Sequence, residues 1–222
     1  MTPVQFDSLL FAPAWLNASI AASEDDENQP ALYRSVSVEW FQQGVQLIST
    51  DSTLLIGAWV PSSEDIDTAR PDIDEAPIAS YVVRDTNKRM ASLMKFAHGE
   101  ARAAEKDGTP APQLTLSVRS MEADDTPTLS PAFDRLMLVA ETDRERLALP
   151  VFEAEFANWR SLLSRGSQGS AVRQVAWPVQ TLGRLGGLRD LGGPLVFTMA
   201  GKTGATRITA GNMFGALSPA PL

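Results

Sequence analysis

The stretch ASYVVRDTNKRMASLMKFAHGEARAA, residues 79–104, decides how the chain is organised, because it runs from a strand pattern directly into a helix pattern. Residues 79–85 contain Tyr81, Val82 and Val83, residue types that favour strands. Over residues 86–104, apolar and small side chains recur at helical spacing and gather, at about 100° per residue, into one stripe. The stripe consists of Met90, Leu93, Met94, Ala97, Ala101 and Ala104. Asp85 or Thr86 is a suitable N-cap, and Gly108 lies past the end. We therefore predict a strand over 79–85 and a helix over 86–104.

The polar side of this helix is basic although the chain is acidic. Lys88, Lys95 and Arg102 recur every seven residues, opposite the apolar stripe, and drift by only about 20° per step. With Arg89 they outnumber the one acid, Glu100, in a chain whose formal net charge is −8. Such a row is either an ordinary solvated face or a surface that contacts phosphates. No aromatic series accompanies it, so contact with the nucleic-acid backbone is favoured over base reading.

The order strand, helix, three strands occurs three times along the chain, as an internal repeat of pattern rather than of sequence identity. The strand pattern of residues 44–61 is divided by the turn TDST at 50–53. The helix of the third unit is weakened by glycine. The first unit comprises strand 4–11, helix 13–23, strand 31–41 and two strands within 44–61; the second comprises 79–85, 86–104, 112–120, 133–143 and 145–156; the third comprises 171–178, 179–189, 194–201, 205–211 and 212–219. We expect a complete two-unit domain at 1–155, a linker at 156–170 and a half domain at 171–222.

Composition excludes several classes of protein. The 222 residues are 44% hydrophobic, which suits a globular core. Cysteine is absent and His98 is the single histidine, so disulfides, thiolate metal sites and multi-histidine metal sites are excluded. The acidic runs at 24–29 and 63–77 read as solvated loops. With no signal-peptide pattern and no membrane-span pattern, we expect a cytoplasmic protein.

We find no catalytic constellation, so we expect neither an enzyme nor a bound cofactor or metal. AGKTGAT at 200–206 resembles the end of a phosphate-binding loop, but Val196 stands where that motif needs glycine, and a strand pattern follows it. His98 lies on the basic helix with Ser92, and no Asp of that helix is placed to orient the imidazole.

Three segments resemble the sliding clamps of DNA polymerases. GVQLISTDSTLLIGAWV (44–60) is similar to the clamp hairpin whose turn carries a Thr-Asp pair, and EFANWRSLL (155–163) resembles the segment that joins domains in bacterial clamps. VRQVAWPVQTLGRLGGL (172–188), followed by PLVFTMAG and MFGALSP, is similar to their closing helix and strands. The resemblance spans nearly the whole chain, although Ala157 and Ser218 depart from the usual Pro and Met.

The resemblance implies an α+β clamp fold in which helices line a ring and sheets form its outside. It implies a non-catalytic processivity factor that encircles double-stranded DNA without reading its sequence, is opened by a clamp loader and tethers a replicative DNA polymerase. The short chain, taken with this resemblance, suggests a phage gene. The inner-wall residues of the clamp would be Lys88, Arg89, Lys95, Arg102 and Arg184. The first helix has no basic residue, so the positive lining would be uneven. A groove for partner peptides would involve Leu129, Phe133, Phe214, Leu217 and Pro219.

The resemblance also implies a homo-oligomer. Clamp rings contain twelve units, so three units per chain would close a ring as a tetramer. A fourth unit within 120–170 would instead give a trimer. The alternative to a clamp is a self-assembling structural protein, of virion type, that uses the same repeat for oligomerisation.

Overall fold

The structure is a computed structural model that describes residues 2–22, 31–84, 88–121, 135–152, 156, 158–165, 176–199 and 204–219. Two helices and the strands around them form the amino-terminal part. The first unit contains β1 (Val4–Asp7), α1 (Ser8–Ser19), the 3₁₀ turn η1 (Ala31–Arg34), β2 (Val36–Phe41), β3 (Gly44–Thr50) and β4 (Leu54–Pro61). The second contains β5 (Ala79–Val83), α2 (Arg89–Lys106), β6 (Gln113–Met121), β7 (Arg135–Glu141) and β8 (Arg146–Phe152).

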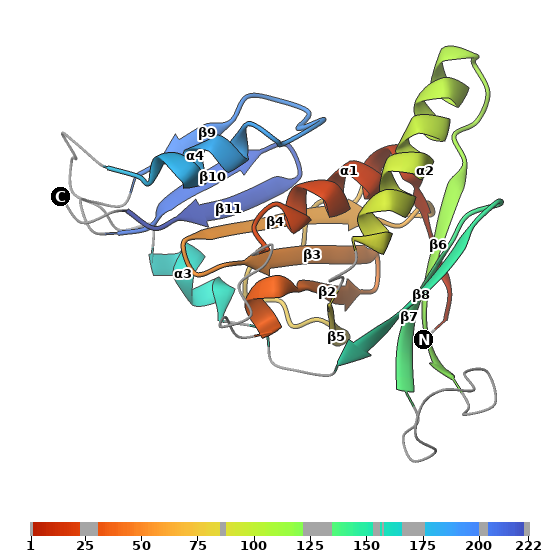
Figure 1. The fold of residues 1–222 in the computed structure, drawn as a ribbon, viewed down its shortest axis with the longest axis horizontal. Helices are drawn as coiled ribbons and strands as arrows, with labels where there is room; N and C mark the ends of the chain where they lie inside the picture. Colours follow the sequence, from red (N-terminus) through yellow and green to blue (C-terminus); the bar gives the residue numbers. More distant parts are fainter. Residues whose placement is uncertain are drawn as a thin grey trace.

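The third unit is shorter than the other two. After α3 (Trp159–Arg165), it contains α4 (Val179–Leu185), β9 (Val196–Thr198), β10 (Thr206–Ala210) and β11 (Met213–Leu217). Within the described residues, all eleven strands join in the order β1-β6-β7-β8-β5-β2-β3-β4-β11-β10-β9 (Figure 1). No helix among these residues is long and apolar enough to cross a membrane.

The first two units complete each other by exchanging strands. β1 leaves its own unit to pair with β6, with Val4 opposite Leu116, and β5 pairs with β2, with Val36 opposite Val83. One hydrophobic core then forms across both units, because α1 and α2 pack along each other above the strands. Phe11, Trp15 and Met94 lie at its centre and are at most 1% exposed. Each unit therefore depends on the other to bury its apolar surface.

The third unit joins the first unit rather than the second, although the second precedes it along the chain. β11 pairs antiparallel with β4 from Met213↔Ala58 to Leu217↔Leu54. Gly57 lies opposite Phe214, and a Cβ at residue 57 would meet the Phe214 ring at 2.2 Å. The small residue therefore allows the two units to approach closely.

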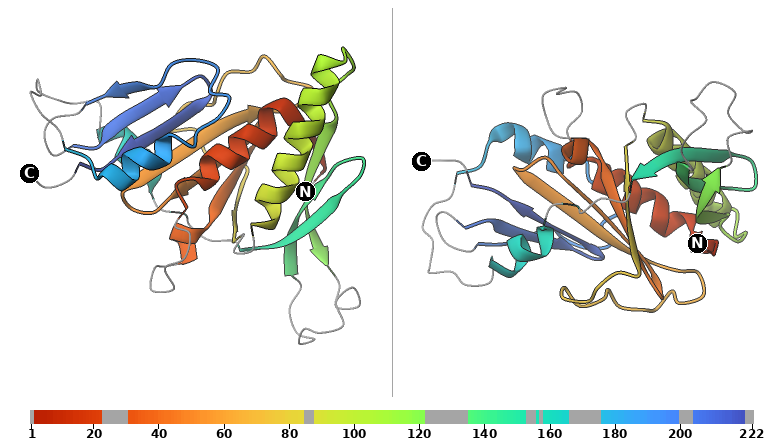
Figure 2. Two further views of the ribbon diagram at one scale, coloured as in Figure 1. Left: turned by 45° about the horizontal axis from the view of Figure 1, so that its top comes forward. Right: turned by 90° about the horizontal axis from the view of Figure 1, so that it is seen from below.

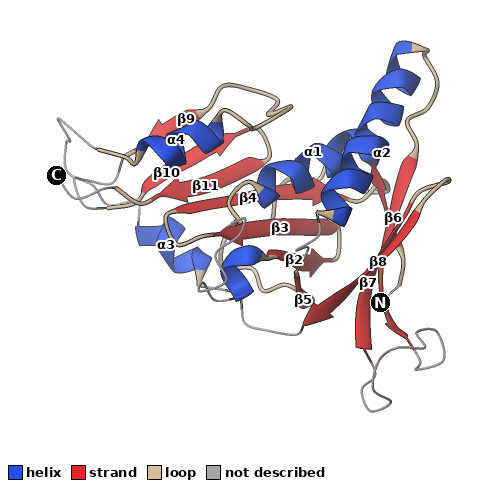
Figure 3. Cartoon of the chain, viewed as in Figure 1, coloured by secondary structure: helices blue, strands red, loops and turns tan. Residues whose placement is uncertain are grey.

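Three helices lie on one side of the sheet. Figure 2 shows α1, α2 and α4 on that side, while α3 and the segment after β4 lie on the opposite side. In the face-on view of Figure 3, α1 and α4 lie over the strands. Alternation along β4 sends Ile56 toward α4 and Leu55 toward α3, so each face of the strand has its own apolar cluster.

Several sequence boundaries were wrong. Strand 4–11 ends at Asp7, because the Asp7 carboxylate accepts a 2.8 Å hydrogen bond from the Leu9 amide and caps a helix that begins at Ser8, not residue 13. Within 31–41, a 3₁₀ turn precedes the strand. The basic helix begins at Arg89 after Lys88, which has a φ of 53° and makes no side-chain cap, and it ends at Lys106. Residues 85–87, where the predicted caps lie, are outside the described residues.

The division into a two-unit domain, a linker and a half domain stays a prediction. The predicted linker 156–170 contains α3, which packs on the sheet. Strand 171–178 falls mostly outside the described residues, and Ala176, Trp177 and Pro178 are not in a strand. The TDST turn is confirmed, since Ser52 has a φ of 78° and the Asp51 carboxylate accepts hydrogen bonds from Thr53 and Leu54.

Candidate nucleic-acid interface

The basic row of α2 lies on the solvent side of the helix layer. Lys88, Arg89, Lys95 and Arg102 are exposed, whereas Met90, Leu93, Met94, Ala97 and Ala101 are buried against the core. The helical periodicity is therefore confirmed, with Ala104 only half-buried. Lys106, also exposed, adds a cation in the last turn that the shorter predicted helix missed.

Arg102 has a carboxylate partner from the third unit. Its guanidinium donates to Asp190 Oδ1, and its Nη1 lies 3.9 Å from Glu105 Oε2. His98 Nε2 lies 3.3 Å from Asp190 Oδ2. Because the Arg102 side chain is 53% exposed, the pair stays accessible to competing anions. No local sequence pattern predicted this partner, because Asp190 lies 88 residues from Arg102 in the chain.

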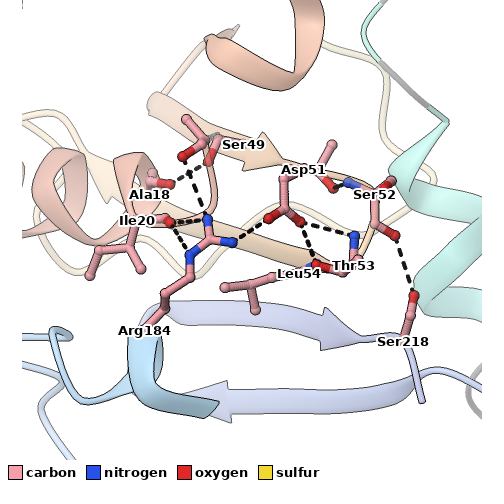
Figure 4. Close-up of polar contacts among 11 residues, drawn as sticks. Ala18, Ile20, Ser49, Asp51, Ser52, Thr53, Leu54, Arg184 and Ser218 are labelled. Carbon is pink, nitrogen blue, oxygen red and sulfur yellow. Dashed lines mark hydrogen bonds and ion pairs between the residues drawn. The ribbon is translucent and has the colours of Figure 1, made fainter. Parts of the chain in front are cut away.

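Arg184 has its guanidinium engaged inside the protein. Figure 4 shows it between the end of α1 and the β3–β4 turn: it donates to the Ile20 carbonyl and pairs with the Asp51 carboxylate. Its side chain is 29% exposed. Burial raises the pKa of Asp51, but the hydrogen bonds from Arg184, Leu54 and Thr53 outweigh it and hold the pKa below its ordinary value. Arg184 therefore tethers the third unit to the first and differs from the exposed cations of α2.

α1 adds no positive charge to the helix side of the sheet. It has no basic residue, and most of it is buried. Asn17 holds the loop after α4, because its side chain donates to the Arg189 carbonyl at 2.8 Å and accepts from the Arg189 amide at 2.9 Å. Arg189 lies past the end of α4 and is exposed. Positive charge on the helix side is concentrated on α2.

Comparison with solved structures decides the fold. The chain matches a sliding clamp of Bacillus subtilis with a TM-score of 0.59 at 10% sequence identity, over 99% of this chain and 65% of that one. It matches the DNA polymerase III beta subunit of Thermotoga maritima with a TM-score of 0.59 at 10% identity, again over 99% and 65%. A griselimycin-bound clamp of Pseudomonas aeruginosa matches with a TM-score of 0.56 at 12% identity, over 98% and 64%.

The chain has the sliding-clamp fold. It spans about 64–65% of the length of the clamp chains that it matches. No family model and no curated protein matches it. The α+β clamp architecture predicted from the three sequence segments is confirmed, at identities too low for residue-by-residue comparison.

Two of the residues predicted to form a peptide groove, Phe214 and Leu217, lie on opposite faces of β11. Phe214 is 1% exposed beneath α3, where its ring lies 5.3 Å from Trp159, whereas Leu217 is fully buried in the cluster on the helix side of β11. Pro219 is half-buried, and Leu129 and Phe133 lie outside the described residues. The groove stays a prediction.

The junction segment of the clamp fold is held by a buried charge. The Glu39 carboxylate, on β2, accepts hydrogen bonds from Trp159 Nε1 at 3.1 Å and from Arg160 Nη2 at 2.7 Å. Arg160 Nε also donates to the Ile73 carbonyl at 2.9 Å. The Trp-Arg pair that carried the sequence resemblance therefore docks α3 on the face of the sheet opposite α1, α2 and α4.

Proposed function

We propose that this protein is a non-catalytic sliding clamp that encircles double-stranded DNA and tethers a replicative DNA polymerase. One observation supports this most: within a sliding-clamp fold, an exposed row of cations lies on the helix side of an acidic chain. Phosphates attract such a row without sequence preference, because the contacts are to the DNA backbone. Lys88, Arg89, Lys95 and Arg102 are the proposed contacts.

The proposed clamp works as a ring of several chains in the cytoplasm, with a tetramer favoured and a trimer next. Its partners would be DNA, a polymerase and a clamp loader. Net negative charge elsewhere opposes general adhesion to DNA, so retention would depend on encirclement.

The test uses nicked circular DNA on beads, with the loaded protein washed at moderate salt before and after linearisation. A clamp stays bound to the circle and leaves once the DNA is cut. A protein that stays on linear DNA, or never binds the circle when a loader is supplied, is not acting as a clamp.

Charge reversal identifies the surface that faces DNA. Lys95→Glu combined with Arg102→Glu is expected to lower duplex affinity at least tenfold and to reduce the slope of log affinity against log salt by about 1.8, or about 0.9 for each lost contact. Arg119→Glu is the control, because Arg119 is exposed on β6 and alternates with the buried Val118 that faces the core. Equal effects at both places would contradict the proposed interface. No effect on replication from either change would favour the structural assembly protein.

A further inference from the structure

Arg70 and Arg207 lie close together beside Phe214, on the face of the sheet opposite α1, α2 and α4. Phe214 and Ala216 of β11 face α3 there, and Arg207 of β10 is paired with Ala216, so its side chain shares that face. Arg70, from the segment after β4, crosses the same face with its guanidinium carbon 4.5 Å from the centre of the Phe214 ring. Arg207 is therefore the diagonal neighbour of Phe214, within reach of Arg70 for side chains of this length.

Neither arginine has a neutralising partner among the residues that the structure describes. Arg207 Nε is buried, and no described atom accepts a hydrogen bond from it. No described carboxylate forms an ion pair with either guanidinium, although both side chains are half-buried. Arg160 on the same face differs, because the buried Glu39 carboxylate pairs with it. Removing a charge from water costs free energy unless an opposite charge compensates, so two such unpaired cations call for a counterion.

The two guanidinium groups repel each other. Burial lowers the pKa of Arg70, and the positive charge of Arg207 lowers it further, whereas Asp72 acts more weakly in the opposite direction. The repulsion is therefore not cancelled by the acid nearest to Arg70 in the chain. Ionisable groups that perturb one another without a structural partner are typical of binding sites, where a ligand supplies the missing charge.

We propose that Arg70 and Arg207 bind a small phosphate-type anion on this face of the sheet. A guanidinium presents several N–H donors in one plane, which match the oxygens of a phosphate group in pairs. The Phe214 ring holds Arg70 in place through a cation–π contact, and the buried Arg207 Nε supplies a donor that has no other acceptor among the described atoms. The bound anion removes the repulsion between the two cations.

The acids around the site favour a small anion over a nucleic acid. Residues 62–78, which carry Arg70, also contain Glu64, Asp65, Asp67, Asp72, Asp74 and Glu75. A duplex would bring many phosphates against these acids, whereas one phosphate group needs only the two arginines. The site lies on the opposite side of the sheet from the basic row of α2, so it is separate from the proposed DNA contact and does not rest on clamp function.

Titration of the full chain with inorganic phosphate, followed by phosphorus NMR in chloride at constant ionic strength, tests the site. Wild type is expected to bind phosphate saturably. Arg207→Met should raise the dissociation constant at least about tenfold, because it removes the charge and the buried Nε donor while keeping much of the apolar stem. Arg119→Met, at an exposed arginine of β6, and the combined Lys95→Glu and Arg102→Glu should leave it unchanged. No saturable binding, or equal weakening by Arg207→Met and Arg119→Met, would overturn the proposal.

Thermal unfolding provides a second readout, one that a purely structural arginine would not give. In chloride, Arg207→Met is expected to melt no lower than wild type, because it relieves the repulsion on Arg70. In phosphate at the same ionic strength, wild type should gain more than the variant, since a ligand stabilises the folded state that binds it. A lower melting temperature of the variant in chloride, or equal gains in phosphate, would overturn the proposal.

Competition identifies the source of the phosphate group. Glycerol phosphate that displaces inorganic phosphate with equal affinity assigns the site to a phosphoryl group on a larger ligand, and much weaker displacement assigns it to the free ion; both support the site. Displacement by acetate at the same concentration would show that any anion binds, and would overturn the phosphate assignment. None of these experiments uses DNA, so the anion site can stand if clamp function fails, and clamp function can stand if the anion site fails.

Discussion

The pair formed by Arg102 and Asp190 decides how much positive charge α2 presents to solvent. Asp190 lies in the loop after α4 and has a φ of 46°. Its carboxylate forms an ion pair with Arg102, one of the residues predicted to form the basic row of α2. Exposed ion pairs contribute about 0–1 kcal/mol, so a phosphate can displace this carboxylate at little cost. The Asp190 carboxylate of the third unit therefore reduces the net positive charge of the basic surface on α2.

Asp190→Asn is expected to release Arg102 and to raise duplex affinity several-fold at low salt. The slope of log affinity against log salt should steepen by up to about 0.9, the value for one added phosphate contact. Fluorescence anisotropy with a labelled duplex across a salt series measures both quantities. Asp67→Asn, an exposed position after β4, controls for the change in overall charge. Matching gains in the two variants would show that Arg102 had not been restrained.

The ionisation of Asp51 makes the free energy of unfolding depend on pH in the acid range. The pKa of this carboxyl group is lower in the folded protein than in the unfolded chain, so its contribution to the free energy of unfolding is present above the unfolded pKa of about 3.9 and is lost as pH falls through the lower folded pKa. Asp51→Asn should destabilise the protein by about 1–3 kcal/mol at neutral pH, because it removes the charge that Arg184 binds.

Urea unfolding of wild type and Asp51→Asn at pH 7 and pH 3 measures this dependence. The difference between the two proteins should shrink at the lower pH, because Asp51 takes up a proton there more readily in the unfolded wild-type chain than in the folded protein. Glu64→Gln is an exposed control that should follow wild type at both values. A constant difference would mean that the charge of Asp51 does not stabilise the turn.

At the scale of elements, the β4–β11 junction depends on the absence of a side chain at residue 57. Gly57→Ala is expected to destabilise the protein by about 1–3 kcal/mol, because the new methyl group would overlap the Phe214 ring. Gly99→Ala is the matched control on α2: its Cβ would meet nothing within 4 Å, so it should stabilise the helix by about 0.5–1 kcal/mol. Thermal unfolding compares the pair, and a loss at residue 99 as large as that at 57 would contradict the steric account.

The docking of α3 on the sheet depends on the ion pair between the buried Glu39 carboxylate and Arg160. The Glu39 side chain is 5% exposed, so Arg160→Met alone leaves an unpaired buried carboxylate and should cost about 3–5 kcal/mol. Combining it with Glu39→Gln should recover part of that loss, because the charge is then gone. Chemical denaturation of the two single variants and the double variant measures the coupling. Strictly additive losses would show that the two side chains do not act as a pair.

At the scale of the whole molecule, assembly and DNA contact should respond differently to salt. Large exposed side chains of the third unit, such as Val179 and Phe197, are apolar, whereas the proposed DNA surface is a row of cations. Raising salt from about 50 mM to about 500 mM should weaken duplex binding by orders of magnitude while leaving the assembly intact. Sedimentation velocity beside anisotropy on the same samples measures this. Dissociation into single chains across that range would contradict an apolar contact.

Much of the local architecture could be predicted from residue patterns. The apolar stripe of α2 identified the buried side of a helix, and the TDST turn identified a hairpin, because both depend on neighbours within a few residues. Asp7 was missed as a cap, since Pro13 offered a stronger local signal for a helix start. α3 was missed as well, because seven residues of Trp159–Arg165 carry too little periodicity, and Glu39, the residue that holds them, lies 121 positions from Arg160.

The sequence by itself determined the repeat, the basic side of α2 and the clamp resemblance, because periodicity, turn chemistry and charge spacing are local properties of the chain. Tertiary structure alone decided that the third unit lies beside the first, that Arg184 and Arg102 have carboxylate partners, and that no strand among the described residues covers the outer edge of β9. These features arise from contacts between residues far apart in the chain. Such contacts form wherever strand edges and apolar faces find complementary surfaces, which no local pattern specifies.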